Sequence, residues 1–151
     1  MSTSTNGTVG QVLEFRLSGE AYCVSIDYVA EIVDVGDLTS IPNAPEHIKG
    51  VMDLRGETTA IIDPKVRFEL DGDVGDRIII FDPTVFEDDR SVGWAVDSVH
   101  EVARVDSEAI DDPPVDRDHV RSIIKRDDGF VIWVDPSEMV VTGSTATPAA
   151  D

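Results

Sequence analysis

Histidine and cysteine side chains are the groups from which a metal centre or a nucleophilic site is most often built. His47, His100 and His119 are separated by 53 and 19 residues, and none of them lies beside Cys23. This spacing predicts histidines in loops or on the surface instead of a metal or catalytic site. Cys23 lies in a short apolar run of strand type, which indicates a buried and inert thiol.

Carboxylates are the second group with possible chemistry. Asp71, Asp73 and Asp76 resemble part of a calcium loop, but the Glu at the twelfth position that completes an EF-hand loop is absent. Because Asp and Glu make up 31 of the 151 residues, such pairs are expected by chance, and we interpret 71–76 as a solvated turn. The sequence holds no Gly-rich phosphate loop or nucleophile elbow, so it predicts neither an enzyme nor a cofactor.

The charge of the chain limits its partners. Twelve Lys and Arg against 31 Asp and Glu give a formal net charge of -19. Nucleic acid and anionic membrane surfaces are excluded, because both are bound through Lys and Arg. The acidic residues are spread from Glu14 to Glu138 and only three Lys are present, a pattern that resembles proteins of salt-accumulating halophiles. An acidic protein that mimics nucleic acid would have the same charge, so that alternative stays open, as does an unrecognised small enzyme.

Length and composition predict one folded domain. A chain of about 150 residues buries roughly 68–70% of its unfolded surface and needs no disulfide or metal to hold it together. A single cysteine allows no internal disulfide, which indicates a reducing compartment. No long apolar run and no signal-peptide pattern is present, so we expect a cytoplasmic protein without direct membrane insertion. Small polar residues at 1–10 and 142–151 predict disordered ends around a domain at 11–141.

The elements that would position any site are short strands. Apolar residues come in runs of alternating or β-branched character, punctuated by Gly, Pro and Asp. The runs lie at residues 13–17, 22–26, 29–34, 50–54, 58–62, 77–81, 91–96, 99–105 and 130–134. The turn at 18–20 joins the first two runs into a hairpin. This pattern predicts a mainly antiparallel β protein, as barrels or a sandwich.

Signals for helices are few. Asp63-Pro64 and Asp135-Pro136 each combine an N-cap acceptor with a Pro at the first helical position, and each predicts a short helix. The second would end within about two turns, near Val141. Residues 44–50 predict one or two further helical turns that end at Gly50.

Residues 41–63 are the most informative segment. They predict a helical turn, a strand, a tight turn at Arg55-Gly56 and a returning strand. The nine residues after Arg55 carry no cation, so its guanidinium should make a specific interaction. Either an internal contact that stabilises the turn or a contact across an interface satisfies this pattern.

Taken together, these segments resemble the CheW family of chemotaxis coupling proteins. The resemblance covers roughly residues 11–141. It is carried by Tyr22-Cys-Val-Ser-Ile26, Val29-Ala-Glu31-Ile32, the stretch from Ile41-Pro42 to Gly50-Val51, the signature Asp53-Leu54-Arg55-Gly56, Ile61-Ile-Asp63, the run 78–80, Gly93-Trp-Ala-Val-Asp97-Ser-Val99 and the run 130–135.

The resemblance implies a fold of two small SH3-like five-stranded β-barrels packed together, with short helical connections and no catalytic activity. It also implies an adaptor that joins the cytoplasmic tips of chemoreceptors to the regulatory domain of the histidine kinase CheA. Such an adaptor would associate with membrane receptor arrays through its partners.

Site residues follow from the same resemblance. Family positions matching Val29, Glu31 and Ile32 lie near kinase contacts, and those matching Gly50 and Arg55 are tied to receptor and kinase coupling. Gly56 completes the signature turn. A hydrophobic groove between the barrels takes the receptor tip in the family, and our candidates to line it are Val51, Leu54, Val99 and Val102. A core role is the alternative for these residues.

Three positions depart from the family pattern. Asp53 stands where the family usually has Asn, Ala60 replaces a frequent Pro, and Pro64 replaces a frequent Leu. The change at Asp53 puts a structural amide hydrogen bond in doubt. The signature turn itself is intact.

Overall fold

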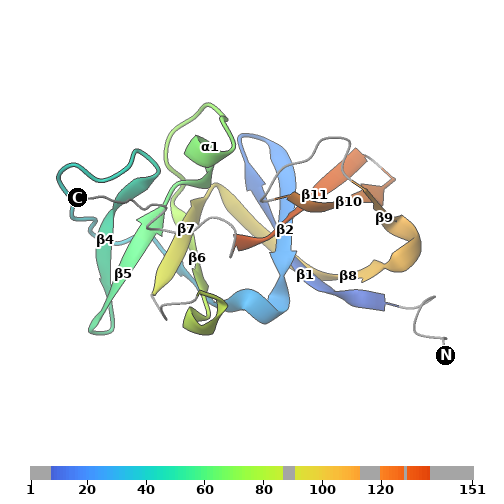
Figure 1. The fold of residues 1–151 in the computed structure, drawn as a ribbon, viewed down its shortest axis with the longest axis horizontal. Coiled ribbons are helices and arrows are strands. Elements are labelled where there is room, and N and C mark those ends of the chain that lie inside the picture. Colours follow the sequence, from blue (N-terminus) through green and yellow to red (C-terminus); the bar gives the residue numbers. More distant parts are fainter. Residues whose placement is uncertain (1–7, 87–90, 113–119, 128, 137–151) are drawn as a thin grey trace, which may run out of the picture.

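The computed structural model describes residues 8–86, 91–112, 120–127 and 129–136, and it is built from two β-sheets. Sheet I has six strands, in the order β8 (Ser98–Asp106), β1 (Thr8–Leu17), β2 (Glu20–Ser25), β11 (Gly129–Val134), β10 (Val120–Arg126) and β9 (Ile110–Asp111). Sheet II has five, in the order β3 (Val29–Asp34), β6 (Arg77–Phe81), β7 (Val92–Val96), β5 (Glu57–Ile62) and β4 (Ile48–Leu54). The two sheets lie side by side along the long axis of the molecule (Figure 1). The prediction of a mainly β protein is confirmed.

Two tight turns form as the sequence predicts. Ser18 and Gly19 have φ of 52° and 85° between β1 and β2, and Arg55 and Gly56 have φ of 52° and 87° between β4 and β5. Positive φ at both central residues is the geometry whose twist suits a two-residue hairpin. Each turn therefore closes its hairpin in register, Leu17 opposite Glu20 and Leu54 opposite Glu57.

Helices occupy little of the chain. The helix α1 (Pro64–Arg67) begins as predicted, with the Asp63 carboxylate accepting a hydrogen bond from the Lys65 amide at 3.1 Å. Short 3-10 turns lie at η2 (Ile26–Tyr28), η3 (Pro83–Val85) and η4 (Ser107–Ala109). The second predicted helix, from Asp135 toward Val141, lies largely outside the described residues. No helix in the described part of the chain is long and apolar enough to cross a membrane.

The prediction of helical turns at 44–50 is wrong. The chain there makes hydrogen-bonded turns, Ala44 N to Ile41 O at 3.3 Å and Ile48 N to Pro45 O at 3.0 Å, and enters β4 at Ile48. Gly50 does not stop a helix but lies inside β4 at φ 149°. Backbone pairing with β5 outweighs the local helix signal of Pro45-Glu46.

Two strands lie outside the predicted runs. β10 is charged at Arg121, Lys125 and Arg126, which hides its apolar positions, and β9 is only two residues long. The first strand also begins at Thr8, inside the segment 1–10 predicted to be disordered; the rest of both predicted tails lies outside the described residues.

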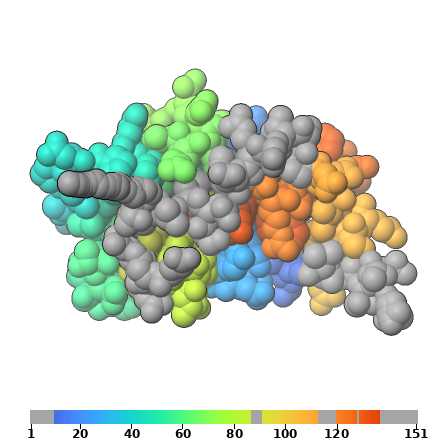
Figure 2. Space-filling view, viewed as in Figure 1, coloured from blue at the N-terminus to red at the C-terminus, as the bar shows by residue number. Residues whose placement is uncertain are grey.

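The largest apolar cluster joins the two sheets. It includes Phe15, Leu17 and Val24 from sheet I and Phe81 and Trp94 from sheet II. A second cluster fills sheet I around Val12, Cys23 and Trp133, and a third fills sheet II around Met52, Ile61 and Ile78. Each half therefore has its own core, and a shared core holds the halves together; the space-filling view shows them as neighbouring parts of one elongated body (Figure 2).

Sheet II curls back on itself. Its edge strands β3 and β4 are at opposite ends of the strand order, yet Thr39, which follows β3, pairs with Val51 of β4. Both hydrogen bonds of this bridge measure 2.9 Å. The bridge brings the two edges toward each other and places the residues of the candidate site close together.

Candidate functional site

An ion pair joins the two edges of sheet II at the signature turn. The Arg55 guanidinium donates to the Glu31 carboxylate, and the side chains remain 67% and 33% exposed. Arg55 comes from the β4–β5 turn and Glu31 from β3, 24 positions earlier in the chain. Because a guanidinium has five N–H donors, Arg55 keeps donors free for solvent or a partner. The predicted specific interaction of Arg55 is thus present within the chain, and its exposure leaves an interface role open.

Val29 and Ile32 lie on the same strand as Glu31. Both are half-buried on β3 and pack against the cluster shared by the two sheets, while neighbouring Val33 packs inside sheet II. A register shift between Val29 and Glu31 marks a bulge in the pairing with β6. Irregular strands of this kind redirect side chains, and here Glu31 reaches Arg55.

Gly50 has a structural reason to be glycine. A Cβ built on it would lie 2.5 Å from the Thr39 carbonyl oxygen, and its φ of 149° is a conformation that other residues rarely adopt. Gly50 therefore allows the Thr39–Val51 bridge to form. Gly56 differs, because a Cβ there would meet no atom within 4 Å and only its φ of 87° favours glycine.

The four groove candidates lie on two separate edge strands. Val51 and Leu54 are half-buried on β4 of sheet II, and Leu54 packs into the core of that sheet. Val99 and Val102 lie on β8 of sheet I, where Val99 packs on the shared cluster and Val102 is 43% exposed. Figure 1 shows β4 at one end of the molecule, with β8 running toward the other. The structure therefore does not gather these four side chains around one point.

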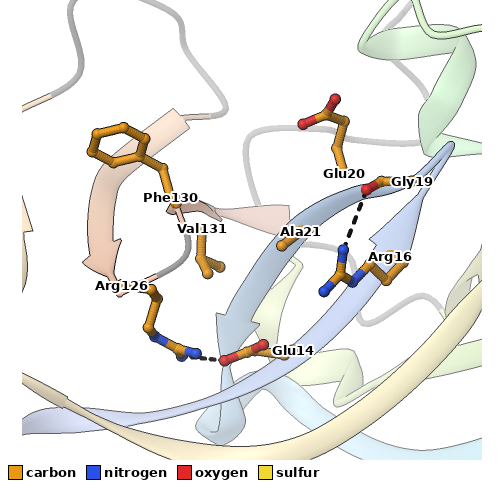
Figure 3. Close-up of a pocket in the computed structure, with 9 residues that line it drawn as sticks. Glu14, Arg16, Gly19, Glu20, Ala21, Arg126, Phe130 and Val131 are labelled. Atoms are coloured by element: carbon orange, nitrogen blue, oxygen red, sulfur yellow. Dashed lines mark hydrogen bonds and ion pairs between the residues drawn. The ribbon is translucent and has the colours of Figure 1, made fainter.

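A polar recess opens on sheet I, between its two hairpins. β2 and β11 run parallel and pair only at Tyr22–Ile132 and Cys23–Trp133, so their beginnings diverge around a cavity of about 330 Å³. Within it Arg126 bonds to Glu14 and Arg16 donates to the Gly19 carbonyl at 3.2 Å (Figure 3). Exposed Phe130 stands at its rim. The sequence gives no signal for this recess, because its residues come from segments over a hundred positions apart.

The buried titratable groups have the properties of core residues. Burial, with the negative charge of Glu14, raises the pKa of the Cys23 thiol to about 12, while Arg126 opposes the shift. The predicted buried thiol is confirmed. His47 lies in a turn as predicted but is buried, contrary to a surface position, and burial with nearby Arg67 lowers its pKa. His100 is exposed, and His119 lies outside the described residues.

Metal-binding residues do not cluster in the described residues: no three His, Cys, Asp or Glu side chains lie together as ligands. The 71–76 segment is a loop whose Asp71 and Asp73 use backbone carbonyls, not carboxylates, to accept hydrogen bonds from Ser18 and Lys65. What the arrangement offers chemically is a set of surfaces and ion pairs.

Most of the chain matches a known protein family. The model of the CheW-like domain matches residues 11–142. This chain belongs to the CheW family.

Individual CheW proteins resemble the chain over most of its length. The chemotaxis protein CheW of Klebsiella aerogenes is 39% identical over 108 residues, which cover 71% of this chain and 64% of that protein. CheW of Bacillus subtilis is 28% identical over 149 residues, 93% of each chain. The crystal structure of the scaffolding protein TtCheW from Thermoanaerobacter tengcongensis superposes with a TM-score of 0.73 at 34% identity, covering 83% of this chain and 88% of that one.

These likenesses confirm the predicted fold class and function. Sheets I and II are the two SH3-like β subdomains of a CheW fold; sheet II has the five strands that the resemblance implies, whereas sheet I has six. The chain is accordingly a chemotaxis coupling adaptor.

The departures from the CheW pattern fit the structure. Asp53 is exposed on β4, Ala60 pairs with Val92 across β5 and β7, and Pro64 begins α1 behind the Asp63 cap. None of them disturbs the Arg55-Gly56 turn.

Sequence reasoning missed a polar cluster around a buried lysine of α1. Lys65 is 3% exposed, and its ammonium donates to the Asp97 carboxylate at 2.7 Å and to the Asp73 carbonyl at 2.6 Å. One available signal was the rarity of lysine, since Lys65 is one of only three in the chain. The other signal was the polar pair Asp97-Ser98, which separates two apolar runs.

Proposed function

We propose that the protein couples the cytoplasmic tips of chemoreceptors to the regulatory domain of the histidine kinase CheA, without catalysing a reaction. The match of residues 11–142 to the CheW-like domain carries this proposal. An adaptor needs no catalytic centre, and its contribution is a coupling free energy between two binding surfaces.

The Glu31–Arg55 pair and its surroundings are the proposed kinase and receptor site. Val29, Glu31 and Ile32 lie on one edge strand, and Gly50, Val51, Leu54, Arg55 and Gly56 lie on the other and its turn. The ion pair holds these two edges together while leaving Arg55 exposed. Val99 and Val102 on β8 are the proposed contribution of the second subdomain.

The proposed function implies that the protein associates with membrane receptor arrays through its partners. An apolar contact of Val102 or Leu54 with a receptor helix would persist in concentrated salt, which screens ion pairs between exposed groups.

A pull-down in molar KCl with the full chain as bait tests the partners. We expect recovery of a histidine kinase and of chemoreceptors. Their absence would contradict the proposed partners, and recovery of a DNA-binding protein in their place would favour a nucleic-acid mimic. Arg55→Ala as a second bait should recover less of both.

A further inference from the structure

The two sheets are linked by a corner one residue long. The chain passes from sheet I to sheet II between β2 and β3 and returns between β7 and β8. β7 ends at Val96 and β8 begins at Ser98, so Asp97 alone separates a strand of one sheet from a strand of the other. Short links at element ends are the positions about which subdomains rotate.

Asp97 is held from both sides of that corner. Its backbone N–H donates to the Arg16 carbonyl at 3.0 Å, and its Oδ2 accepts from the Ser18 N–H at 2.7 Å, both in the β1–β2 hairpin of sheet I. Its Oδ1 accepts from the Lys65 ammonium at 2.7 Å. Lys65 lies on α1, which follows β5 of sheet II in the chain. One carboxylate therefore bridges the two sheets.

The 71–76 loop completes the contact. The Asp73 carbonyl accepts from Lys65 at 2.6 Å, and the Asp71 carbonyl accepts from the Ser18 hydroxyl. A Cβ on Gly75 would lie 2.1 Å from the Val96 carbonyl oxygen, so the loop backbone rests directly against the end of β7. Figure 1 shows the tip of the β1–β2 hairpin beside α1.

Burial of its cation distinguishes this ion pair from the others in the described residues. The Lys65 side chain is 4% exposed and that of Asp97 is 35% exposed, whereas the cations of the other pairs are 33% to 67% exposed. Partly buried pairs are screened by salt much less than exposed ones. The shared apolar cluster keeps the sheets in contact, but apolar burial is non-directional, whereas hydrogen bonds to one carboxylate fix a direction.

We propose that Lys65 is the positioning residue that fixes the angle between the two subdomains, by clamping Asp97 at the corner between β7 and β8. The clamp sets the position of the Glu31–Arg55 site on sheet II relative to β8 on sheet I. Its consequence for partners rests on the proposed adaptor function, because an adaptor must present both surfaces at once.

A distance measurement between spin labels on the two sheets tests the clamp without any partner. Thr58→Cys on β5 and Glu101→Cys on β8 provide exposed labelling sites, and the buried Cys23 thiol, with its pKa of about 12, stays unlabelled. Lys65→Met removes the ammonium and keeps the alkyl chain. Lys125→Met is the matched control, since it removes the exposed lysine that pairs with Asp111.

We expect a broader or displaced distance distribution in Lys65→Met, with native circular dichroism, and the parent distribution in Lys125→Met. A parent distribution in Lys65→Met would overturn the clamp. Should Lys65→Met fail to fold, Asp97→Asn keeps the acceptor for Ser18 and removes the charge, and the same two results decide the question.

Affinity measurements distinguish the Lys65 clamp from the proposed adaptor function. With one partner bound, the affinity of Lys65→Met for the other should fall by about 5- to 150-fold, while its affinity for each partner alone is unchanged. Equal loss of both single affinities would contradict a positioning role. If the unmodified protein binds neither partner, the adaptor proposal fails, and the distance measurement still decides the clamp.

Discussion

Arg55 combines a structural contact with an exposed guanidinium, and substitution separates the two roles. Arg55→Ala breaks a pair that is largely exposed, so the free energy of unfolding should fall by only about 0–1 kcal/mol. If the free donors of Arg55 contact a partner, affinity should fall at least about tenfold, or about 1.4 kcal/mol. Calorimetric titration with the kinase regulatory domain, beside thermal unfolding, measures both.

Arg77→Ala is the matched control for that experiment, because Arg77 forms an exposed pair with Asp34 on the same sheet. It should leave affinity unchanged. Equal binding by Arg55→Ala and the unmodified protein would remove Arg55 from the interface, and loss of folding would make it structural.

Substitution of Gly50 should change the stability of the fold. Gly50→Ala places a methyl group against the Thr39 carbonyl oxygen and forces alanine into a strained φ, so we expect unfolding to become easier by about 1–3 kcal/mol. Gly10→Ala is the control, since a Cβ there meets no atom within 4 Å and should change stability by less than about 0.5 kcal/mol. Chemical denaturation of both variants measures the difference. Equal stability of Gly50→Ala and Gly10→Ala would show that the contact of the new methyl group with the Thr39 carbonyl oxygen is relieved without loss of stability.

Single residues were predictable where a local pattern carries the information. Arg55 stands out because no cation follows it for nine residues, but its partner Glu31 lies on another strand and only the curl of sheet II brings them together. The burial of His47 was missed because the turn residues around it carry no local sign of burial.

The turn before β4 is coupled to the start of α1, since the Asp63 N–H donates to the His47 carbonyl at 2.8 Å. Burial lowers the pKa of His47 below its ordinary 6.5, so the fold favours the neutral ring. The unfolded chain then binds more protons, and this contribution to stability, complete above pH 6.5, is lost as pH falls through the lowered pKa.

His47→Leu should therefore reduce the loss of stability between about pH 7.5 and pH 5, measured as the change in urea midpoint. His100→Leu, which removes an exposed imidazole, should keep the loss seen in the unmodified protein. An unchanged pH dependence in His47→Leu would show that His47 is not among the groups responsible.

The secondary-structure elements match the predictions from sequence where the turn residues and the alternation of apolar residues indicate the same structure. Both tight hairpins and α1 are determined locally, by positive-φ turn residues and by the Asp63 cap. The helical turns expected at 44–50 did not form, because pairing with β5 and the Thr39 bridge compete with the local signal. β10 was missed because three cations interrupt its apolar alternation.

The whole molecule has three apolar clusters in its interior and a net negative surface. The residues that hold the sheets together are apolar, and in the Lys65–Asp97 pair between them the lysine is buried while the Asp97 side chain is 35% exposed. The net charge of -19 therefore acts mainly through repulsion on the outside. Sequence alone could predict this repulsion, because it depends on composition more than on which side chains meet.

Salt should stabilise the fold for that reason. The screening length falls from about 10 Å at 0.1 M to about 3 Å at 1 M salt, so repulsion among exposed carboxylates should decline and the midpoint of thermal unfolding should rise from low to molar KCl. A variant that neutralises four exposed acids, Asp37→Asn, Asp53→Asn, Glu57→Gln and Glu101→Gln, lowers the charge from -19 to -15 (-19 + 4) and should respond less. It should also be more stable than the parent at low salt. A midpoint that does not rise with KCl in the parent would contradict the halophile interpretation, and an identical salt response in both would show that salt acts through something other than charge repulsion.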